Sequence, residues 1–434
     1  METGALYVLY QQHPEVCTDT RKIKRGCIFF ALQGLNFDGN AFAAEALRLG
    51  AAYAVVSDPL LSGSQYIYVN DTLDALQSLA HYHRSQLNIP VIAITGSNGK
   101  TTTKELISTA LFQRYKVHST TGNLNNHIGV PLTILSTPPG TEIVVCEMGA
   151  NHPGEIEALC KIALPTHGII TNIGYAHLEG FGSIEGVQKA KSELFDYLNI
   201  HDGHAFINVD DPRLLQSVER MHHYTSYGFD ASHRPDLCFK FIPETRDGGF
   251  IVEDRNGYIR IHSQMFGFYN ASNVIAAFTV AQHFKVAVEK IVSSLSSFIP
   301  SANRSETFYY MGNRIIKDAY NANPSSMEVA LRAFAQEYPN GWVILGDMKE
   351  LGTESESAHE RMVGIIEELG FKNVVLVGKA FSFAIQNKKN VFSILIVAGR
   401  IEDLKSGWDW SKCMDQTLLL KGSRSMSMEK LLES

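Results

Sequence analysis

A loop containing glycine, lysine and threonine follows the apolar stretch VIAIT at residues 91–95. Its pattern is Gly96-x-x-Gly99-Lys100-Thr101, and the two glycines permit backbone angles that a side chain forbids. The backbone amides of such a loop, together with the N-terminus of the next helix, bind anions. Lys100 can then reach the terminal phosphates of a nucleoside triphosphate, and the Thr101 hydroxyl can bind Mg²⁺. The sequence therefore predicts a phosphate-binding loop made of Gly96, Ser97, Asn98, Gly99, Lys100, Thr101 and Thr102.

This loop is a shortened form of the usual pattern, because Ile94 stands where a further glycine is normally found. The alternative is an ordinary glycine-rich turn between a strand and a helix. The succession of apolar strand, two glycines, lysine and three threonines favours phosphate binding over that alternative. By itself the loop identifies its ligand only as a nucleoside triphosphate.

Two further residues, Glu147 and His177, could place a metal ion beside the phosphates. Glu147 ends the apolar run EIVVCE, and we expect His177 to end the strand that begins with HGII. In an open parallel sheet, ligands gather at the carboxyl ends of the strands. Taken singly, the alternatives are a solvated strand end for Glu147 and a hydrogen-bonded loop histidine for His177. Their position beside a phosphate loop favours a metal site.

The elements that must position these residues fall into three blocks, 1–86, 87–303 and 304–434. The first contains short strands, a helix over 42–49 and a polar helix over 71–86. The middle block alternates apolar strands with helical segments, which predicts a mostly parallel sheet covered by helices. The last block repeats this alternation through GWVILGD, NVVLVG and TLLLKGS. We therefore expect an α/β protein with a small α/β domain, a central P-loop ATPase-like domain and a C-terminal Rossmann-like domain.

Composition narrows the class of protein. The chain has 434 residues and a net charge of −7 without a basic run, which argues against a nucleic-acid partner. Its six cysteines are scattered without a CxxC pair, which fits a reducing cytoplasm and disfavours a zinc site or a disulfide framework. The first residues lack the features of a signal peptide, and no apolar run reaches the ~20 residues of a membrane span. A cytoplasmic monomer without a membrane span is expected.

A series of motifs covers nearly the whole chain in a fixed order: TGSNGKTT, TGNLNNHIGVP, EMGANHPGEI, TNIGYAHLEGFGS, AKSELF, NVDD, YNASN, DAYNANPSSM, LGDMKELG and KGSR. With these motifs the chain resembles the Mur ligases of peptidoglycan synthesis. YNANPSSM followed by LGDMKELG resembles the members that add D-alanyl-D-alanine to UDP-N-acetylmuramoyl-tripeptide. The resemblance implies an ATP-dependent ligase that forms ADP and phosphate through an acyl phosphate, with these two molecules as substrates. The first block then becomes the UDP-substrate domain and the last the amine-substrate domain.

The resemblance also implies catalytic and metal-binding roles. Lys100 would lie along the β- and γ-phosphates, and Thr101 and Glu147 would bind one Mg²⁺. A second Mg²⁺ would use Glu147, His177 and Lys191, the last as a carbamate formed with CO₂. A free lysine cation beside Mg²⁺ would be repelled, whereas a carbamate is an anion. The alternative for Lys191 is an ordinary lysine on the surface of a helix.

For the nucleotide, the resemblance points to Asn270 and Asn273 at the adenine, Arg304 at the γ-phosphate and Asp318 near the ribose. The alternatives are helix caps for the asparagines, a linker salt bridge for the arginine and an Asx turn for the aspartate. The chain departs from the family at two positions, each directly before one of these candidates. Tyr269 stands where the family usually has histidine, and Asn303 stands where it more often has glycine.

For the other substrates, the resemblance supplies three groups of candidates. Those for the UDP-sugar are Thr18, Thr20, Arg21, Phe30 and Asp38, and those for the muramoyl-peptide end are Asn123, Asn125, Asn126 and His127. The candidates for the amine substrate are Asn321, Asn323, Ser325 and Glu350. A structural arginine, a solvated loop and a turn held by Asx hydrogen bonds are the corresponding alternatives.

Two other functions remain open from the sequence. One is another ligase of the same superfamily, such as a folylpolyglutamate-synthase-like enzyme, although such proteins place the phosphate loop close to the N-terminus. The other is a P-loop ATPase without ligase activity, which would have no need of His177, Lys191 and a third α/β block. The sequence leaves open whether the third residue of the tripeptide is meso-diaminopimelate or lysine.

Overall fold

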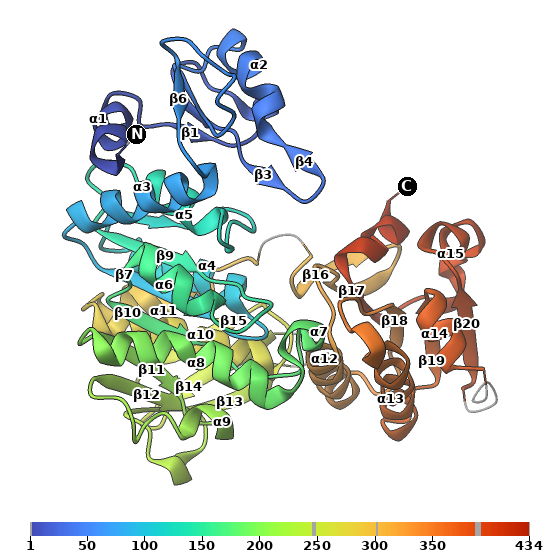
Figure 1. The fold of residues 1–434 in the computed structure, drawn as a ribbon. Coiled ribbons are helices and arrows are strands. Elements are labelled where there is room, and N and C mark those ends of the chain that lie inside the picture. The colour runs from blue at the N-terminus through green and yellow to red at the C-terminus, as the bar shows by residue number, and fades with distance from the viewer. Residues whose placement is uncertain (1, 245–248, 301–302, 387–391, 434) are drawn as a thin grey trace.

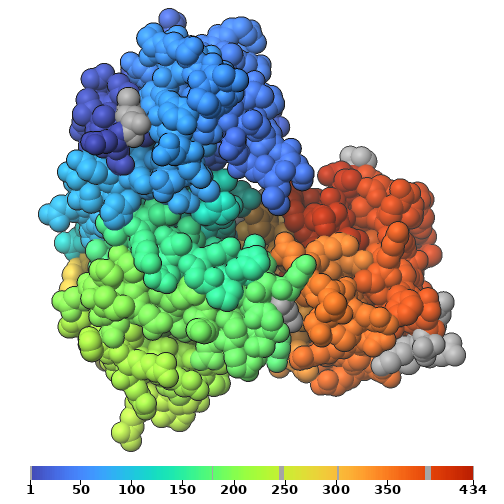
Figure 2. Space-filling view, viewed as in Figure 1, coloured from blue at the N-terminus to red at the C-terminus, as the bar shows by residue number. Residues whose placement is uncertain are grey.

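Three sheets, which follow one another along the chain, form the framework of the molecule (Figure 1). The computed structural model describes residues 2–244, 249–300, 303–386 and 392–433. The sheets have four, nine and six strands, and a separate two-stranded ribbon projects from the first domain. The N-terminal domain sits above the central domain and the C-terminal domain lies beside it, with a notch between the two outer domains (Figure 2).

The N-terminal domain is a parallel sheet in the order β1-β2-β5-β6. Alternate residues of its strand β2 enter different cores: Ile28 and Phe30 face α1 and α3, while Phe29 faces α2. The ribbon of β3 and β4 leads into the turn before α2. The bounds are α1 Thr3–Gln12, β1 Val16–Cys17, η1 Thr20–Lys22, β2 Ile28–Phe30, β3 Gln33–Gly34, β4 Phe37–Asp38, η2 Gly39–Phe42, α2 Ala43–Arg48, β5 Tyr53–Val56, β6 Tyr66–Tyr68 and α3 Thr72–Gln86.

The central sheet has the order β15-β14-β13-β12-β11-β10-β7-β9-β8. From β8 to β13 neighbouring strands are parallel, whereas β14 and β15 are antiparallel additions at one edge. The strands are β7 Val91–Thr95, β8 Val117–Ser119, β9 Ile143–Glu147, β10 His167–Ile170, β11 His204–Asn208, β12 Tyr224–Gly228, β13 Leu237–Glu244, β14 Gly249–Asp254 and β15 Arg260–Ser263.

Helices cover both faces of this sheet, and the central strand β7 is therefore buried on both sides. Val91 and Ala93 pack with α5, α6 and α8, while Ile92 and Ile94 pack with α4, α10 and α11. This explains why β7 reads as a continuous apolar run rather than an alternating one. The helices are α4 Lys100–Leu111, α5 Gly129–Leu135, α6 Glu155–Ala163, α7 Leu178–Phe181, α8 Ile184–Ile200, α9 Pro212–Leu215, η3 Ala231–His233, α10 Phe268–His283 and α11 Val288–Ser296.

The C-terminal domain has the sheet order β16-β17-β21-β18-β19-β20, parallel except for β16. Residues of β18 again alternate between two cores, so that Val343 faces α12 and α13 while Ile344 faces α15. The elements are β16 Glu306–Tyr310, β17 Asn313–Asp318, α12 Pro324–Glu337, β18 Trp342–Gly346, η4 Gly352–Glu354, α13 Ser355–Glu368, β19 Asn373–Val377, α14 Lys379–Ala384, β20 Ile394–Ala398, α15 Ile401–Gly407, η6 Trp410–Cys413, β21 Thr417–Lys421, η7 Arg424–Met426 and η8 Met428–Leu432.

The predicted α/β class, with a mostly parallel central sheet, is confirmed. One strand prediction was wrong: β10 ends at Ile170, and His177 lies in the loop before α7 rather than at a strand end. The chain leaves the sheet early because Thr171 and Asn172 turn toward the phosphate loop and bond to its backbone. The antiparallel strands β14 and β15 were not expected either. Among the described residues, no helix has both the length and the apolar character needed to cross a membrane.

Candidate functional site

A cavity of about 1180 Å³ lies where the central and C-terminal domains meet. Most of the candidates of the central domain line it, with Gly96 and Lys191 as the exceptions: the loop Ser97–Thr102, Asn123, Asn125, Asn126, His127, Glu147, His177, Asn270 and Asn273. The C-terminal side supplies Asp318, Asn321, Asn323, Ser325 and Glu350, and Arg304 enters from the linker between the domains. Candidates that are more than 200 residues apart in sequence therefore share one cavity.

The phosphate loop requires both of its glycines. Gly96 has φ 138° and Gly99 has φ 80°, in the region that L side chains rarely adopt. A Cβ at Gly96 would lie 2.0 Å from the Thr171 hydroxyl, and one at Gly99 would lie 2.7 Å from the Asn273 carboxamide oxygen. Gly99 caps α4, whose first N–H groups have no acceptor within the helix. The loop is therefore packed tightly between the end of β10 and α10, and the free N–H groups at the start of α4 suit an anion.

Lys100 folds back over this loop. Its Nζ donates to the carbonyl of Gly96 at 2.7 Å and lies 3.4 Å from that of Ser97. Burial lowers the pKa of Lys100, the Glu147 charge acts in the opposite direction, and the Arg304 charge lowers the pKa further. The positive charges of Lys100 and Arg304 therefore repel each other across the cavity. An anion between them would relieve both the burial cost and this repulsion.

Glu147 is the centre of a compact oxygen-rich group. One carboxylate oxygen accepts from the Thr101 hydroxyl and the other from the Asn125 carboxamide, both at 2.8 Å. The side chain is 2% exposed, and no ion pair to it is found in the part of the chain that the structure describes. A buried carboxylate held only by neutral donors fits a cation bound beside it.

Lys191 lies behind the cavity wall. The residue is 1% exposed, its Nζ donates to the carbonyl of Ala150 at 3.0 Å, and it sits 5.0 Å from the centre of the Phe181 ring. Ala150 itself lines the cavity. Burial, followed by the Lys100 charge, lowers the pKa of Lys191 to about 7. The alternative of a surface lysine is therefore wrong, and the amine carries a proton only part of the time at neutral pH.

His177 contacts the C-terminal domain. Its Nδ1 lies 3.0 Å from a carboxylate oxygen of Glu350, and both residues have positive φ. Glu350 was expected at the amine substrate and His177 at the metal. The structure instead joins them across the domain boundary, and no group of three His, Cys, Asp or Glu side chains able to hold a metal is found among the described residues. Of the four expected metal ligands, only Thr101 and Glu147 are in contact.

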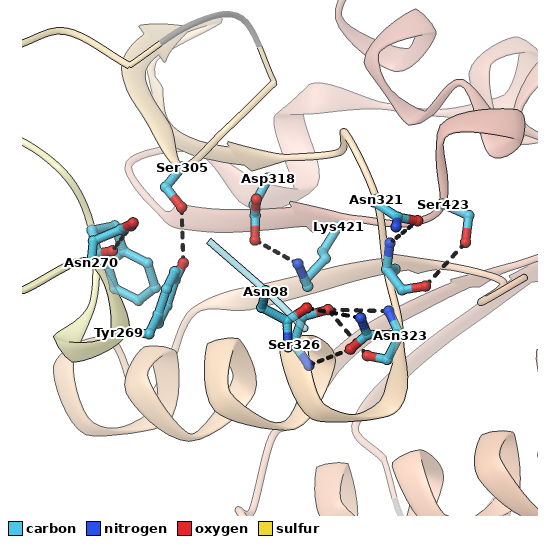
Figure 3. A network of polar contacts seen from close by, with 12 residues as sticks. Asn98, Tyr269, Asn270, Ser305, Asp318, Asn321, Asn323, Ser326, Lys421 and Ser423 are labelled. Atoms are coloured by element: carbon cyan, nitrogen blue, oxygen red, sulfur yellow. Dashed lines mark hydrogen bonds and ion pairs between the residues drawn. The ribbon is translucent and has the colours of Figure 1, made fainter. Parts of the chain in front are cut away.

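Two other amine-substrate candidates also bridge the domains. The Asn323 carboxamide donates to Asn98 Oδ1 at 2.8 Å while its oxygen caps α12 through Ser326 (Figure 3). The Ser325 hydroxyl accepts from the backbone N–H of Tyr175 at 2.7 Å. The α12 N-terminus is thereby fastened directly to the phosphate loop. Asn321 uses its carboxamide oxygen within its own turn, where it accepts from the N–H of Ala322.

The two adenine candidates are partly used by the protein itself. Asn273 accepts from the Thr103 hydroxyl at 3.1 Å and donates to Asn270, which in turn donates to the carbonyl of Phe266. Each carboxamide keeps one N–H and one lone pair for a ligand. Tyr269, the residue that departs from the family, directly precedes Asn270 in sequence and shares a hydrogen bond of 2.9 Å with Ser305 (Figure 3).

Asp318 and Arg304 have partners that the sequence did not reveal. Lys421 Nζ lies 2.5 Å from Asp318 Oδ2, because β17 and β21 are parallel neighbours that bring these residues into register (Figure 3). The Arg304 guanidinium carbon lies 3.6 Å from the centre of the Tyr320 ring. Lys421 and Tyr320 both line the cavity. Lys421 belongs to the motif KGSR and Tyr320 to DAYNANPSSM, and membership of these motifs was the only feature of the sequence that pointed to them.

The UDP-substrate candidates of the N-terminal domain lie outside this cavity. Arg21 is exposed and forms an ion pair with Asp19 at 2.8 Å, and Asp38 accepts from the N–H of Asn40. Thr18 and Thr20 are half-buried on the same domain. Phe30 was a wrong choice, because its side chain is 0% exposed and forms part of the domain core. A strand residue that packs inward cannot contact a ligand on the surface.

The muramoyl-peptide candidates lie on the loop after β8, between the phosphate loop and α3. Asn126 caps α5 by accepting from the N–H groups of Ile128 and Gly129. His127 and Asn123 are exposed on the cavity wall. Gln77 of α3 donates to the His127 carbonyl at 2.9 Å. The loop is thus fixed at its C-terminal end and open to the cavity along its length.

Three family models match the chain. The model described as "Mur ligase family, catalytic domain" matches residues 15–84, "Mur ligase middle domain" matches 94–281, and "Mur ligase, glutamate ligase domain" matches 303–424.

Similar proteins agree with these matches. The UDP-N-acetylmuramoyl-tripeptide--D-alanyl-D-alanine ligase of Bacillus subtilis is 36% identical over 428 residues, covering 96% of this chain and 92% of that protein. A crystal structure of MurF from Acinetobacter baumannii has a TM-score of 0.86 at 31% identity and covers 96% of this chain and 92% of that one. The MurF ligase of Thermotoga maritima in complex with ADP has a TM-score of 0.84 at 28% identity, covering 96% of both chains.

Proposed function

The chain belongs to the Mur ligase family, and on that basis we propose that it joins D-alanyl-D-alanine to UDP-N-acetylmuramoyl-tripeptide while ATP is cleaved to ADP and phosphate. The observation that supports this most directly is the single cavity that unites the phosphate loop, the Asn123–His127 loop and the C-terminal domain. A ligase needs all three together, because a carboxylate, a γ-phosphate and an amine must meet. We expect the reaction to take place in the cytoplasm, in keeping with six free cysteines.

The reaction begins with the carboxylate of the tripeptide, which is a poor electrophile until it is phosphorylated. A carboxylate oxygen of the tripeptide attacks the γ-phosphorus, the bond to the β-phosphate oxygen breaks, and ADP leaves. The amine of D-alanyl-D-alanine then attacks the acyl phosphate, loses a proton, and displaces inorganic phosphate. Lys100, the α4 N-terminus and Arg304 line the space where negative charge spreads during this transfer. Their fixed positive charges and N–H groups stabilise the transferring phosphoryl group.

The residues present fit Mg²⁺. The Thr101 hydroxyl and the Glu147 carboxylate are hard oxygen donors already in contact, and Glu147 is a buried carboxylate held by neutral donors. We propose that these two residues hold the Mg²⁺ of the nucleotide, and that Asn125 orients Glu147. When bound, Mg²⁺ neutralises phosphate charge during transfer. A second Mg²⁺ would require His177 to leave Glu350.

Lys191 suits carbamate formation. Only a neutral amine attacks CO₂, and a lysine with a pKa of about 7 is about half neutral at pH 7. The ammonium first loses one proton; the neutral amine then forms an N–C bond to CO₂, one C=O π bond becomes the carboxylate, and a second proton leaves, so the side chain changes overall from a cation to an anion. Around the free amine the structure offers the Ala150 carbonyl and the face of Phe181. We propose that the carbamate lengthens the side chain toward the cavity that Ala150 lines.

The carbamate has a direct test. With ¹³C-labelled bicarbonate, the wild-type protein should give a carbamate carbon signal in NMR that Lys191→Arg lacks. Lys191→Ala should lose roughly 100-fold or more of its activity while keeping its fold. Short carboxylates should partly restore Lys191→Ala and leave Lys191→Arg inactive, since arginine fills the space with a cation. Wild-type activity in Lys191→Arg would refute the carbamate.

The ligase function is tested by substrate dependence. Phosphate release from ATP should require both D-alanyl-D-alanine and a UDP-N-acetylmuramoyl-tripeptide, and running the assay with the meso-diaminopimelate and lysine forms decides which is preferred. Release that ignores both substrates would instead indicate an ATPase, and release with a folate and glutamate would indicate the folylpolyglutamate-synthase-like alternative.

Within that assay Lys100→Ala should lower kcat roughly 100- to 1000-fold, because it removes the cation that lies over the phosphate loop. Lys290 is an exposed residue of α11, so Lys290→Ala is the matched control and should behave as wild type. Normal turnover in Lys100→Ala would contradict the placement of ATP.

A further inference from the structure

The linker that carries Arg304 into the cavity is tied down at three consecutive residues. The carbonyl of Asn303 accepts from the N–H of Tyr320 at 3.1 Å. The guanidinium of Arg304 stacks on the ring of the same tyrosine, 3.6 Å from its centre. The hydroxyl of Ser305 shares a hydrogen bond of 2.9 Å with the Tyr269 hydroxyl (Figure 3). Each of the three residues from 303 to 305 is therefore restrained by a contact with a tyrosine.

The backbone on either side of Arg304 is unusual. Asn303 has φ 68° and Ser305 has φ 51°, both in the left-handed region. Asparagine tolerates that region, but serine does so at a cost, and such a conformation persists only where the surroundings impose it. Ser305 is 4% exposed, and Tyr269 supplies a partner for its side chain. The two turns together direct the intervening arginine to one side of the chain.

The two tyrosines anchor the linker to different domains. Tyr269 is in the first turn of α10, next to the Asn270 of the nucleotide cavity, and Tyr320 follows β17 of the C-terminal sheet. Both line the cavity, as do Arg304 and Lys100. Without an anion, two cations facing one cavity repel, and a long arginine side chain is free to turn toward water. Stacking on an aromatic face opposes that movement, and the planar guanidinium is suited to it.

We propose that Tyr320 and Tyr269 are positioning residues that hold Arg304 over the phosphate loop, Tyr320 through its ring and Tyr269 through Ser305. This inference rests on the proposed function, since it assumes that Arg304 meets the γ-phosphate. It goes beyond that function by naming two residues that act through the arginine rather than on the substrate. It also gives a physical role to Tyr269, which stands where the resemblance to other Mur ligases leads us to expect histidine.

The first experiment separates the ring from the hydroxyl of Tyr320. Tyr320→Leu removes the stacking surface, and we expect it to lower kcat roughly tenfold, with KM for the UDP-substrate unchanged. Tyr320→Phe keeps the ring and should recover most of the lost kcat. Tyr309→Leu makes the same chemical change at an exposed site on β16 outside the cavity and serves as the matched control. Equal losses in Tyr320→Leu and Tyr320→Phe would overturn the stacking role.

A double-mutant cycle decides whether Tyr320 acts through Arg304. If it does, the variant carrying both Arg304→Ala and Tyr320→Leu has the same kcat as Arg304→Ala alone, because the partner is already gone. Losses that multiply would show that Tyr320 acts independently of Arg304 and would overturn the inference. Should Tyr320→Leu unfold, Tyr269→Phe provides the same cycle with Arg304→Ala, starting from a smaller loss of roughly threefold.

The outcomes distinguish this inference from the proposed function. If the wild-type protein shows no phosphate release dependent on D-alanyl-D-alanine, the proposed function fails. If it does and Arg304→Ala retains wild-type kcat, then Arg304 has no role for the tyrosines to support and the inference alone is overturned. A loss in Arg304→Ala that the tyrosine variants reproduce without adding to it is the result we expect.

Discussion

The N-terminal domain meets the central domain through apolar side chains, whereas the C-terminal domain meets it mainly through single polar contacts. At the first joint, Leu76 and Leu79 of α3 are fully buried in one core with Val130 and Ile134 of α5. Arg84 strengthens this joint by donating to the carbonyls of Ala163 and Leu164, across the boundary, and to two carbonyls of its own segment.

The second joint is built from pairs. Asn323 bonds to Asn98, Ser325 to the backbone of Tyr175, and Glu350 to His177. Its apolar component is Phe266, which precedes α10 and packs into the core of the C-terminal domain beside Phe334. Phe266 can therefore serve as a pivot while the polar pairs open and close.

This difference predicts which part of the enzyme moves during catalysis. The phosphate loop and the Asn123–His127 loop belong to a body that a shared core makes rigid, because burial of large apolar side chains is costly to reverse. The C-terminal domain is attached mainly by polar contacts that exchange readily with water, each of small net free energy. We therefore expect closure around the substrates to be a movement of the C-terminal domain about Phe266.

The largest effect on stability should come from the first joint. Leu79→Ala removes a fully buried side chain and should lower the free energy of unfolding by about 2–5 kcal/mol. The three tryptophans, Trp342, Trp408 and Trp410, all lie in the C-terminal domain, so their fluorescence reports on that domain alone. Circular dichroism should show an earlier transition while the fluorescence transition stays in place. Equal shifts of both probes would mean that the second joint couples the domains as strongly as the first.

The second largest effect on stability should be a loss of stability of the central domain at acid pH. His167 and His204 begin adjacent strands β10 and β11 and lie near His283. Burial, followed by the charge of His283, lowers the pKa of His167 to about 3 and that of His204 to about 4. The unfolded state binds protons first, so stability is present above about pH 6.5 and declines as the pH falls below it.

We expect a loss on the order of 1–2 kcal/mol between pH 7 and 5, after allowance for partial solvent exposure. Circular dichroism melts across that range measure it. A variant with His167→Gln and His204→Gln should show a flatter dependence, since neither ring can then charge. An unchanged slope would place the acid sensitivity elsewhere.

The smallest effect on stability should come from the second joint. Ser325→Ala removes one hydrogen bond to the Tyr175 backbone and should change the free energy of unfolding by less than about 0.5 kcal/mol. Small-angle scattering of the free protein should nevertheless show a larger radius of gyration. Ser382→Ala, whose hydroxyl bonds within its own helix α14, is the matched control. If Ser325→Ala leaves the scattering unchanged, this contact does not hold the domain in place.

Much of the fold follows from local pattern. VIAIT, IVVCE, HAFIN, WVILG and TLLLK are short, largely apolar runs bounded by polar or glycine-rich turns, and each one is a strand of the structure. The antiparallel strands β14 and β15 were missed because their sequences lack a comparably long apolar run. They are defined by their pairing, β14 with β13 and β15 with β14. The strand through HGII was given too long because bonds from Thr171 and Asn172 to the phosphate loop, which end it, join residues over 70 positions apart.

The sequence by itself determined the phosphate loop, the order of the motifs and the family, because glycine, lysine and threonine at fixed spacing carry their chemistry locally. Only the tertiary structure decided which side chains are in contact: Asp318 with Lys421, Arg304 with Tyr320, and His177 with Glu350. The first pair depends on the register of two strands, the second on two left-handed turns in a linker, and the third on the docking of one domain against another. Each is set by packing between distant segments, which no local spacing encodes.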